Sequence, residues 1–203
     1  MLRLLYFDLE TKYSAEEVGG WANVMDMGMS VGVVWDSLDL KHHVYLEHQA
    51  PALIRHLHQG DLIVGFNHVS FDLRVLAGTR PTEPERQQLY LELVSLHHFD
   101  MLAELKKVLG HRLRLDSIAR PTLQHGKSAD GLQALAWYKE GRIDKIIEYC
   151  KQDVEVTRLV HEHALQHGRL SYDSRQGIKT VALNWSLREP AVAVAAEQMS
   201  LFE

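Results

Sequence analysis

Short apolar segments separated by polar turns dominate the first third of the chain. Four of them have the length and residue content of β-strands, at residues 3–9, 29–36, 42–47 and 61–67. The first three follow one another without a helical period between them, which predicts a meander. The fourth is a continuous apolar run bounded by polar residues, which is typical of a buried strand.

An apolar period of three to four residues replaces this pattern further along the chain. The longest predicted helix covers residues 143–163, and its apolar stripe consists of Ile143, Ile146, Ile147, Cys150 and Val154. The other predicted helices cover residues 51–59, 70–78, 80–95, 101–109 and 131–141. Asp100 is expected to cap the helix that begins at Met101, and Gly110 to end it.

The C-terminal part of the chain divides into a hairpin and an aperiodic tail. Residues 169–185 contain two strand-like runs around the turn SRQG, which predicts a small β-hairpin. Beyond Trp185 no period remains. We therefore expect one domain over residues 1–185 and a flexible tail over residues 186–203. Strands come first and then mix with helices, so the domain is expected to be α/β or α+β with a mixed sheet.

Composition excludes several classes of protein. Hydrophobic residues make up 46% of the 203 residues and charged residues 24%, which is ordinary for a soluble globular domain. No apolar run approaches the ~20 residues of a membrane span, and acids at positions 8 and 10 interrupt any signal-peptide core. Cys150 is the only cysteine, which excludes an internal disulfide and favours a cytoplasmic location.

The net charge of −5 argues against a broad basic face that wraps nucleic acid. One local exception is residues 106–115, KKVLGHRLRL, which contain Lys106, Lys107, Arg112 and Arg114. This segment is the best candidate for a basic track along a single strand. The alternative, a solvated helix end and turn, is equally compatible with the sequence.

Two acids lie in the first apolar segment, at Asp8 and Glu10. Residues two apart in a strand share a face, so their carboxylates are expected to lie close together. Such a pair repels itself unless one acid is protonated or a cation lies between them. All-oxygen ligands favour Mg²⁺ or Mn²⁺. The alternative is that the strand ends earlier and both acids begin a solvated loop.

Two further segments carry candidate chemistry. In FNHVSFD (66–72) a buried strand ends at Phe66 and Asn67, and Asp72 follows at the start of a helix. In YCKQD (149–153) Tyr149 and Asp153 are four residues apart on the long helix, so they project from the same side. Asp100 and Asp116 are expected at helix starts rather than on a metal.

Together FDLET (7–11), FNHVSFD (66–72) and YCKQD (149–153) resemble the motifs of the DEDD exonuclease superfamily, in its tyrosine-bearing branch. The histidine branch has a histidine where this chain has Glu148. Residues 99–110 and 115–119 are also similar to proofreading exonuclease domains of family B DNA polymerases. The resemblance implies an α/β, ribonuclease-H-like exonuclease fold, with a mixed five-stranded sheet flanked by helices.

The same resemblance implies an activity and roles for individual residues. The activity is 3′–5′ exonuclease hydrolysis of terminal phosphodiester bonds by a two-metal mechanism. The implied ligands of two Mg²⁺ or Mn²⁺ ions are Asp8, Glu10, Asp72 and Asp153, and Tyr149 would orient the attacking water. Thr11, Asn67 and Phe71 border the motifs and are candidate substrate contacts, although Asn67 suits support of the strand end better.

The chain ends in a peptide that resembles the bacterial sliding-clamp-binding motif, formed by Gln198, Met199, Ser200, Leu201 and Phe202. The resemblance implies recruitment to the clamp in DNA replication or repair, and hence DNA as the substrate. The alternative for the peptide is a tail folded back on its own domain. For the whole chain, the alternatives are a 3′–5′ exoribonuclease of the ribonuclease D type and a non-catalytic, DNA-end-binding clamp adaptor.

Overall fold

The computed structural model describes residues 2–123 and 131–187, and a five-stranded sheet lies at its centre. The strand order is β3-β2-β1-β4-β5. The bounds are β1 (Leu4–Thr11), β2 (Met29–Asp36), β3 (Lys41–Leu46), β4 (Leu62–Gly65) and β5 (His98–Asp100). β1 pairs antiparallel with β2 and parallel with β4. The expected mixed five-stranded sheet is therefore confirmed, with β1 as its central strand.

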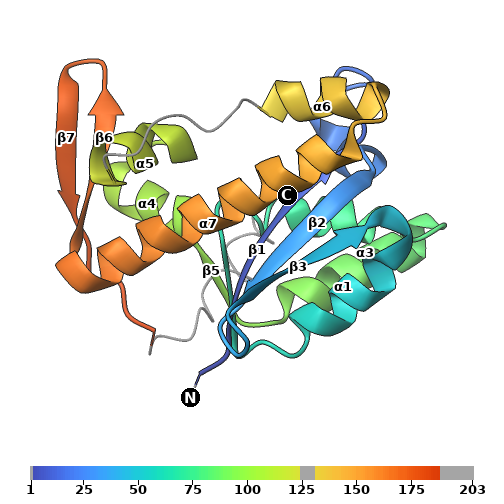
Figure 1. Cartoon of the computed structure of the whole chain (residues 1–203), viewed down its shortest axis with the longest axis horizontal. Coiled ribbons are helices and arrows are strands. Elements are labelled where there is room, and N and C mark those ends of the chain that lie inside the picture. Colours follow the sequence, from blue (N-terminus) through green and yellow to red (C-terminus); the bar gives the residue numbers. More distant parts are fainter. Residues whose placement is uncertain (1, 124–130, 188–203) are drawn as a thin grey trace.

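Helices cover both faces of this sheet (Figure 1). The α-helices are α1 (Ala50–Leu57), α2 (Asp72–Ala77), α3 (Glu83–Val94), α4 (Met101–Leu109), α5 (Leu115–Leu123), α6 (Gly131–Lys139) and α7 (Ile143–His167). Two 3-10 helices, η1 (Trp21–Asp26) and η2 (Glu47–Gln49), and a hairpin of β6 (Arg169–Ser174) and β7 (Gly177–Ala182) complete the described elements. No helix among them is long and apolar enough to cross a membrane.

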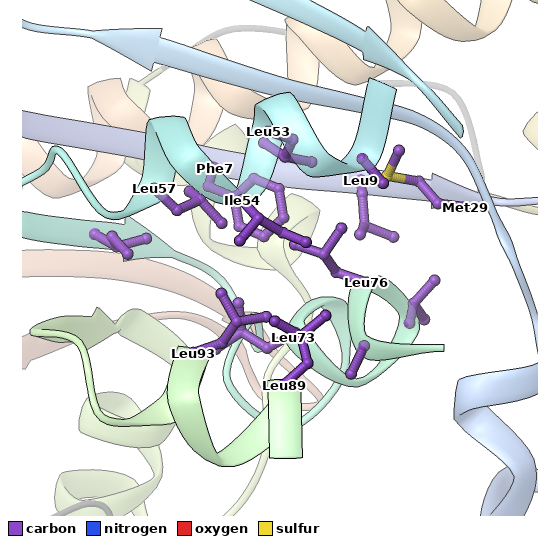
Figure 2. Packing of buried hydrophobic residues seen from close by; sticks show 14 of the residues in the cluster. Phe7, Leu9, Met29, Leu53, Ile54, Leu57, Leu73, Leu76, Leu89 and Leu93 are labelled. Carbon is purple, nitrogen blue, oxygen red and sulfur yellow. The ribbon is translucent and has the colours of Figure 1, made fainter. Parts of the chain in front are cut away.

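Alternation along β1 divides the core into two layers. Leu5, Phe7 and Leu9 pack into the cluster that α1, α2 and α3 cover, and Figure 2 shows Phe7 and Leu9 within it. Tyr6 points the other way, into the cluster that contains buried residues of α7. Even-numbered residues of β1 therefore face α7, because successive side chains in a strand point to opposite faces.

The long helix α7 packs its apolar stripe against this second face. Ile146, Cys150 and Val154 are fully buried there. The helix extends to His167, four residues beyond the predicted end, and Gly168 closes it with a φ of 62°. A left-handed residue at this position satisfies the last carbonyl groups of a helix, and glycine adopts it without steric cost.

Several observed elements differ from the predicted ones, and three of these differences concern β1, β5 and α5. β1 continues to Thr11, so Asp8 and Glu10 lie inside the strand and the solvated-loop alternative is wrong. β5 was not predicted because its three residues are too few to show a period. The helix start expected at Asp116 is confirmed by the first turn of α5, but the extent of this helix, which contains Pro121, was not predicted.

The predicted cap of α4 is present, since the Asp100 carboxylate accepts hydrogen bonds from the backbone N–H groups of Leu102 and Ala103. Most of the predicted tail, residues 188–203, lies outside the described residues. The clamp-binding peptide at residues 198–202 falls within that part. Its recruitment role therefore stays a prediction.

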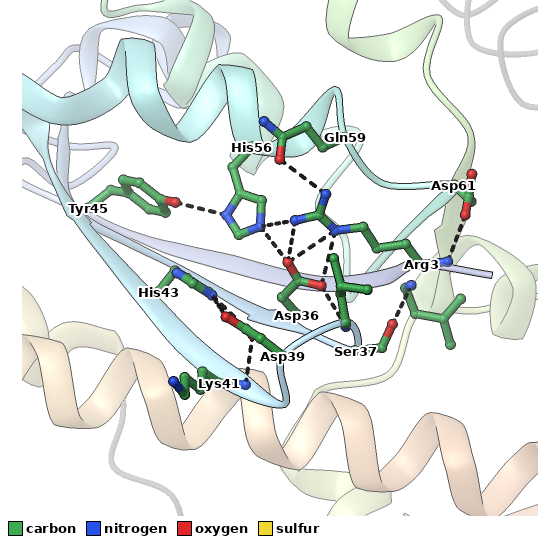
Figure 3. Close-up of polar contacts among 12 residues, drawn as sticks. Arg3, Asp36, Ser37, Asp39, Lys41, His43, Tyr45, His56, Gln59 and Asp61 are labelled. Carbon is green, nitrogen blue, oxygen red and sulfur yellow. Dashed lines mark hydrogen bonds and ion pairs between the residues drawn. The ribbon is translucent and has the colours of Figure 1, made fainter. Parts of the chain in front are cut away.

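A polar network of side chains lies near the N-terminal end of β1 (Figure 3). The Arg3 guanidinium lies 2.6 Å from the buried Asp36 carboxylate, and His56 Nε2 lies 2.9 Å from the same carboxylate. Tyr45 completes the chain through His56 Nδ1 at 2.8 Å. Burial alone would raise the Asp36 pKa, but these partners hold it well below its ordinary value.

One group in this network has the composition of a metal site. Ligand atoms of Asp36, His43 and His56 lie within 4.8 Å of one another. Arg3 already neutralises Asp36, and both ring nitrogens of His56 have protein partners. The group is therefore a structural ion-pair network that joins β1, β2, β3 and α1.

Candidate active site

The two acids of β1 lie on the face that α7 covers. Asp8 and Glu10 share the face of Tyr6, and both are partly buried. Pairing between β1 and β4 ends at Tyr6 and Val64, so the acids extend past the last paired residues. Contact with α7 is direct, because the Cys150 sulfur lies 3.6 Å from Asp8 Oδ2.

Asp72 reaches the same place from the start of α2. It is 3% exposed, and its Oδ1 accepts a hydrogen bond of 3.1 Å from the Leu9 backbone N–H. This bond takes up an N–H group beyond the last β1–β4 pair, so it ties α2 to the open end of β1. Asp72 is close enough to Asp8 for its charge to raise the Asp8 pKa.

Tyr149 and Asp153 approach from α7, one turn apart. The Tyr149 hydroxyl donates a hydrogen bond to the Asp153 carboxylate. Cys150, between them in sequence, is fully buried and fills the space against Asp8. Its pKa is raised by burial and by the neighbouring acids, so the thiol stays neutral and serves as a packing residue.

Burial is the largest influence on the pKa values of these four acids. Burial, together with the other carboxylates, raises the pKa of Asp8 and of Glu10 well above their ordinary values. Burial also raises the pKa of Asp72 to about 8 and that of Asp153 to about 7. Within residues 2–123 and 131–187, no Lys, Arg or His forms an ion pair with any of the four.

The donor set fits hard divalent cations. Ligand atoms of Asp8, Glu10 and Cys150 lie within 4.8 Å of one another. Asp72 and Asp153 stand outside this tight group but interact with it through their charges. Four carboxylates without a protein cation suit Mg²⁺ or Mn²⁺, which prefer oxygen ligands and tolerate water in the remaining positions.

Tyr149 is held in a protonated state. Burial and the charges of Asp153 and Glu10 raise its pKa above that of a free phenol. Its ring also meets Trp137 of α6 edge to face, with ring centroids 6.2 Å apart. The hydroxyl can therefore donate a hydrogen bond in a fixed direction, and it is a poor base at neutral pH.

An apolar cleft of about 830 Å³ opens beside Glu10. Thr11 and Phe71 line it, as does Trp21, which is 72% exposed. The Trp21 and Phe71 rings lie 6.2 Å apart. Helix α6 also lines this cleft, with Leu132, Leu135, Ala136 and Lys139.

The sequence analysis did not single out Trp21 or the cleft-facing residues of α6. Trp21 directly follows Gly19 and Gly20 in a segment without strand or helix period, and this was the only available signal. Close packing of η1 on α2 brings its ring near Phe71. A Cβ atom at Gly78 would overlap the Met25 carbonyl oxygen, so only glycine permits this approach.

Asn67 lies at the end of β4 and does not line the cleft. Its backbone is left-handed, with a φ of 68°, and its N–H donates a 2.9 Å hydrogen bond to Asp100. Its side-chain oxygen accepts hydrogen bonds from Ser70 and from Arg112, at 2.9 and 2.8 Å. These contacts give Asn67 a supporting position at the strand end.

Comparisons with known proteins agree with this architecture. A solved structure of the family B DNA polymerase from the hyperthermophilic archaeon Pyrobaculum calidifontis is similar, with a TM-score of 0.59 and 17% sequence identity. The similarity covers 81% of this chain and only 25% of the polymerase chain. No curated protein matches the sequence. The model of the RNase_H superfamily matches residues 5–165, so this chain belongs to the RNase_H superfamily, as the resemblance of its fold implied.

Proposed function

We propose that this protein is a metal-dependent 3′–5′ exonuclease of the tyrosine-bearing DEDD branch, acting on DNA. The observation that carries the proposal is the group of four acids at the open end of β1. Burial raises the pKa of all four, the charges of the other acids raise those of Asp8 and Glu10 further, and the described part of the chain pairs no cation with them. Such a group is costly to fold unless cations bind to it, which is typical of a metal site.

Asp8, Glu10, Asp72 and Asp153 would hold two divalent ions. When bound, such ions polarise the phosphodiester and lower the pKa of a bound water toward neutrality. Asp8 is central in the group, since the charges of the other three acids all raise its pKa. The Leu9 N–H fixes Asp72, and the Tyr149 hydroxyl restrains Asp153.

Tyr149 would orient the attacking water. Its protonated hydroxyl donates a hydrogen bond and does not remove a proton, because its pKa is raised above that of a free phenol. Trp137 limits the motion of its ring. The role is positional, so Tyr149→Phe should lower kcat by about 10–100-fold. Full turnover by this variant would refute the role.

The apolar cleft beside Glu10 would receive the terminal nucleotide. Phe71 and Trp21 offer ring faces to a base, and Thr11 lies next to the acids. Stacking of this kind is tolerant of base identity and requires an unpaired base. A single-stranded or frayed 3′ end therefore fits the cleft.

The decisive experiment compares DNA and RNA strands labelled at the 3′ or the 5′ end. The full-length chain is incubated with each strand and Mg²⁺ or Mn²⁺, beside an Asp8→Ala control. Release of terminal nucleotides from 3′ ends of DNA by the wild-type protein alone is expected. Release from RNA only would favour the exoribonuclease alternative. No metal-dependent release from any strand would refute the enzyme and favour the non-catalytic adaptor.

Recruitment to a bacterial sliding clamp is the second part of the proposal. It rests on the peptide Gln198, Met199, Ser200, Leu201 and Phe202, and it supports DNA over RNA as the substrate. Pull-down with the clamp tests it, using a chain that lacks residues 198–202. Unchanged capture of the shortened chain would exclude the peptide as the binding element.

A further inference from the structure

Positive charge is concentrated on one lobe of this acidic protein. The lobe consists of residues 106–123, from the end of α4 through α5, and residues 169–182, the β6–β7 hairpin. It holds eight of the chain's 22 Lys and Arg residues but only two of its 27 Asp and Glu residues. The eight are Lys106, Lys107, Arg112, Arg114, Arg120, Arg169, Arg175 and Lys179, and all are exposed.

Few of these charges are neutralised within the described ranges. Lys107 pairs with Glu104 and Arg120 with Asp173, and in the described part of the chain these are the only ion pairs that the eight residues form. Arg112 donates to a neutral partner, the Asn67 side chain. The lobe therefore presents unpaired positive charge to solvent, whereas the rest of the chain carries an excess of acids.

The helical and hairpin parts of the lobe form one surface. The Thr122 hydroxyl donates to the Ser171 carbonyl at 2.8 Å and accepts from the Ser171 N–H at 3.0 Å. The hairpin lies beside α5, at the end of α7 opposite α6 (Figure 1). It also lies beyond residue 165, where the superfamily match ends.

This surface begins at the acids of the candidate active site. Arg112 contacts Asn67, which lies just beyond the end of β4, the strand next to β1. Asp116, in the first turn of α5, is close enough to raise the pKa of Asp153. Basic residues thus extend from the edge of the site along α5 to the hairpin.

We propose that this basic lobe binds the phosphate backbone of the substrate strand on the 5′ side of the scissile end. The inference rests on the proposed exonuclease function and adds to it the surface that holds the strand. Four acids repel a polyanion, and so does the acidic remainder of the chain, so attraction must come from elsewhere. Lysine and arginine side chains supply it by neutralising phosphates and releasing their counterions.

A charge-neutral triple variant of the hairpin tests the proposal. Arg169→Gln, Arg175→Gln and Lys179→Gln together remove three charges from exposed positions outside the candidate active site. The matched control removes three exposed charges elsewhere, with Lys41→Gln, Arg55→Gln and Arg80→Gln. Both variants are full-length chains, and equal thermal unfolding curves verify their folding.

Two measurements on a single-stranded DNA of about 20 nucleotides give the result. In EDTA, which stops hydrolysis, the hairpin variant should bind about tenfold more weakly at low salt. The slope of log affinity against log salt should fall by about 2, since each phosphate contact to a single strand contributes ~0.7. The control variant should keep the wild-type affinity and slope.

Hydrolysis of a small substrate separates this inference from the proposed function. Cleavage of the p-nitrophenyl ester of thymidine 5′-monophosphate with Mn²⁺ should be equal in wild type and hairpin variant, because that substrate has no upstream phosphates. Unchanged affinity and slope in the hairpin variant would overturn the proposed role of the basic lobe. An equal loss of affinity in the control variant would overturn it as well. Absence of any hydrolysis by the wild-type protein would instead overturn the proposed exonuclease function.

Discussion

The two ends of β1 differ in how the acids near them are neutralised. The N-terminal end has one buried carboxylate and the C-terminal end has several that are buried or partly buried, and such groups are costly unless they are paired. At the N-terminal end, Arg3 lies 2.6 Å from Asp36 and the Asp36 pKa is lowered. At the C-terminal end, Asp8 and Glu10 have no cationic partner within the described residues, and their pKa values are raised. The first group is neutralised within the protein, and the second, under the proposed function, is neutralised by divalent cations.

The largest difference between acids at the two ends of β1 is expected in the rate of hydrolysis. Asp153→Asn should reduce metal-dependent hydrolysis by at least about 10³-fold, because a lost metal ligand forfeits several kcal/mol of charge stabilisation. Asp39→Asn, an exposed acid near the other end of β1, is the control and should retain wild-type kcat/KM. Steady-state hydrolysis of a labelled DNA strand measures both. Comparable losses of kcat/KM in the two variants would show that the acids at the two ends do not differ in their role in catalysis.

Stability should respond in opposite directions at the two ends. Asp36→Asn should lower the free energy of unfolding by about 2–3 kcal/mol, since it leaves Arg3 and His56 without their shared partner. Asp8→Asn should raise it by about 1 kcal/mol in metal-free buffer, because it removes one of four repelling charges. Urea unfolding in EDTA measures both, and destabilisation by Asp8→Asn would contradict the repulsion argument.

Divalent cations should stabilise only the second group. At a Mn²⁺ concentration 100 times its dissociation constant, the wild-type protein should gain about 2.7 kcal/mol. Asp36→Asn should gain as much, and Asp8→Asn much less. Thermal unfolding with and without Mn²⁺ reports the gain. An undiminished gain in Asp8→Asn would place the cation elsewhere.

Without metal, the pH dependence of stability should also distinguish the second group. Burial raises the pKa of Asp72 to about 8 from an ordinary value of 3.8, so the folded chain keeps a proton that the unfolded chain has released. Its contribution is therefore fully present below about pH 4 and is lost as the pH rises through 8. Asp72→Asn should flatten the fall in stability between about pH 6 and 9.

The exposed Glu83→Gln on α3 serves as the control for that slope. Buried histidines act in the opposite sense. Burial lowers the pKa of His68 and of His98 to about 3 from 6.5, so their contribution is lost as the pH falls below about 6.5. Identical slopes above pH 6 in wild type and Asp72→Asn would show that Asp72 is not protonated in the fold.

Local patterns identified most of the elements and the acids because each depends on near neighbours in sequence. The strand over Met29–Asp36 was predicted to the residue, since its apolar run is continuous and bounded. The helix over Met101–Leu109 was predicted to the residue as well, because Asp100 and Gly110 mark its two ends. β5 was not predicted, since a three-residue strand has no clear period, and for α5, which contains Pro121, only the start near Asp116 was predicted.

The sequence by itself determined the alternation that places Asp8 and Glu10 on one face of β1, and the spacing that places Tyr149 and Asp153 on one side of α7. Only the tertiary structure decided that Arg3 would neutralise one buried acid and leave the others unpaired, that Trp21 would meet Phe71, and that two basic segments would join through Thr122. The reason is the separation along the sequence, because strand and helix periods relate residues only two to four positions apart. Charge pairing and cleft formation depend on residues that the chain brings together from far apart.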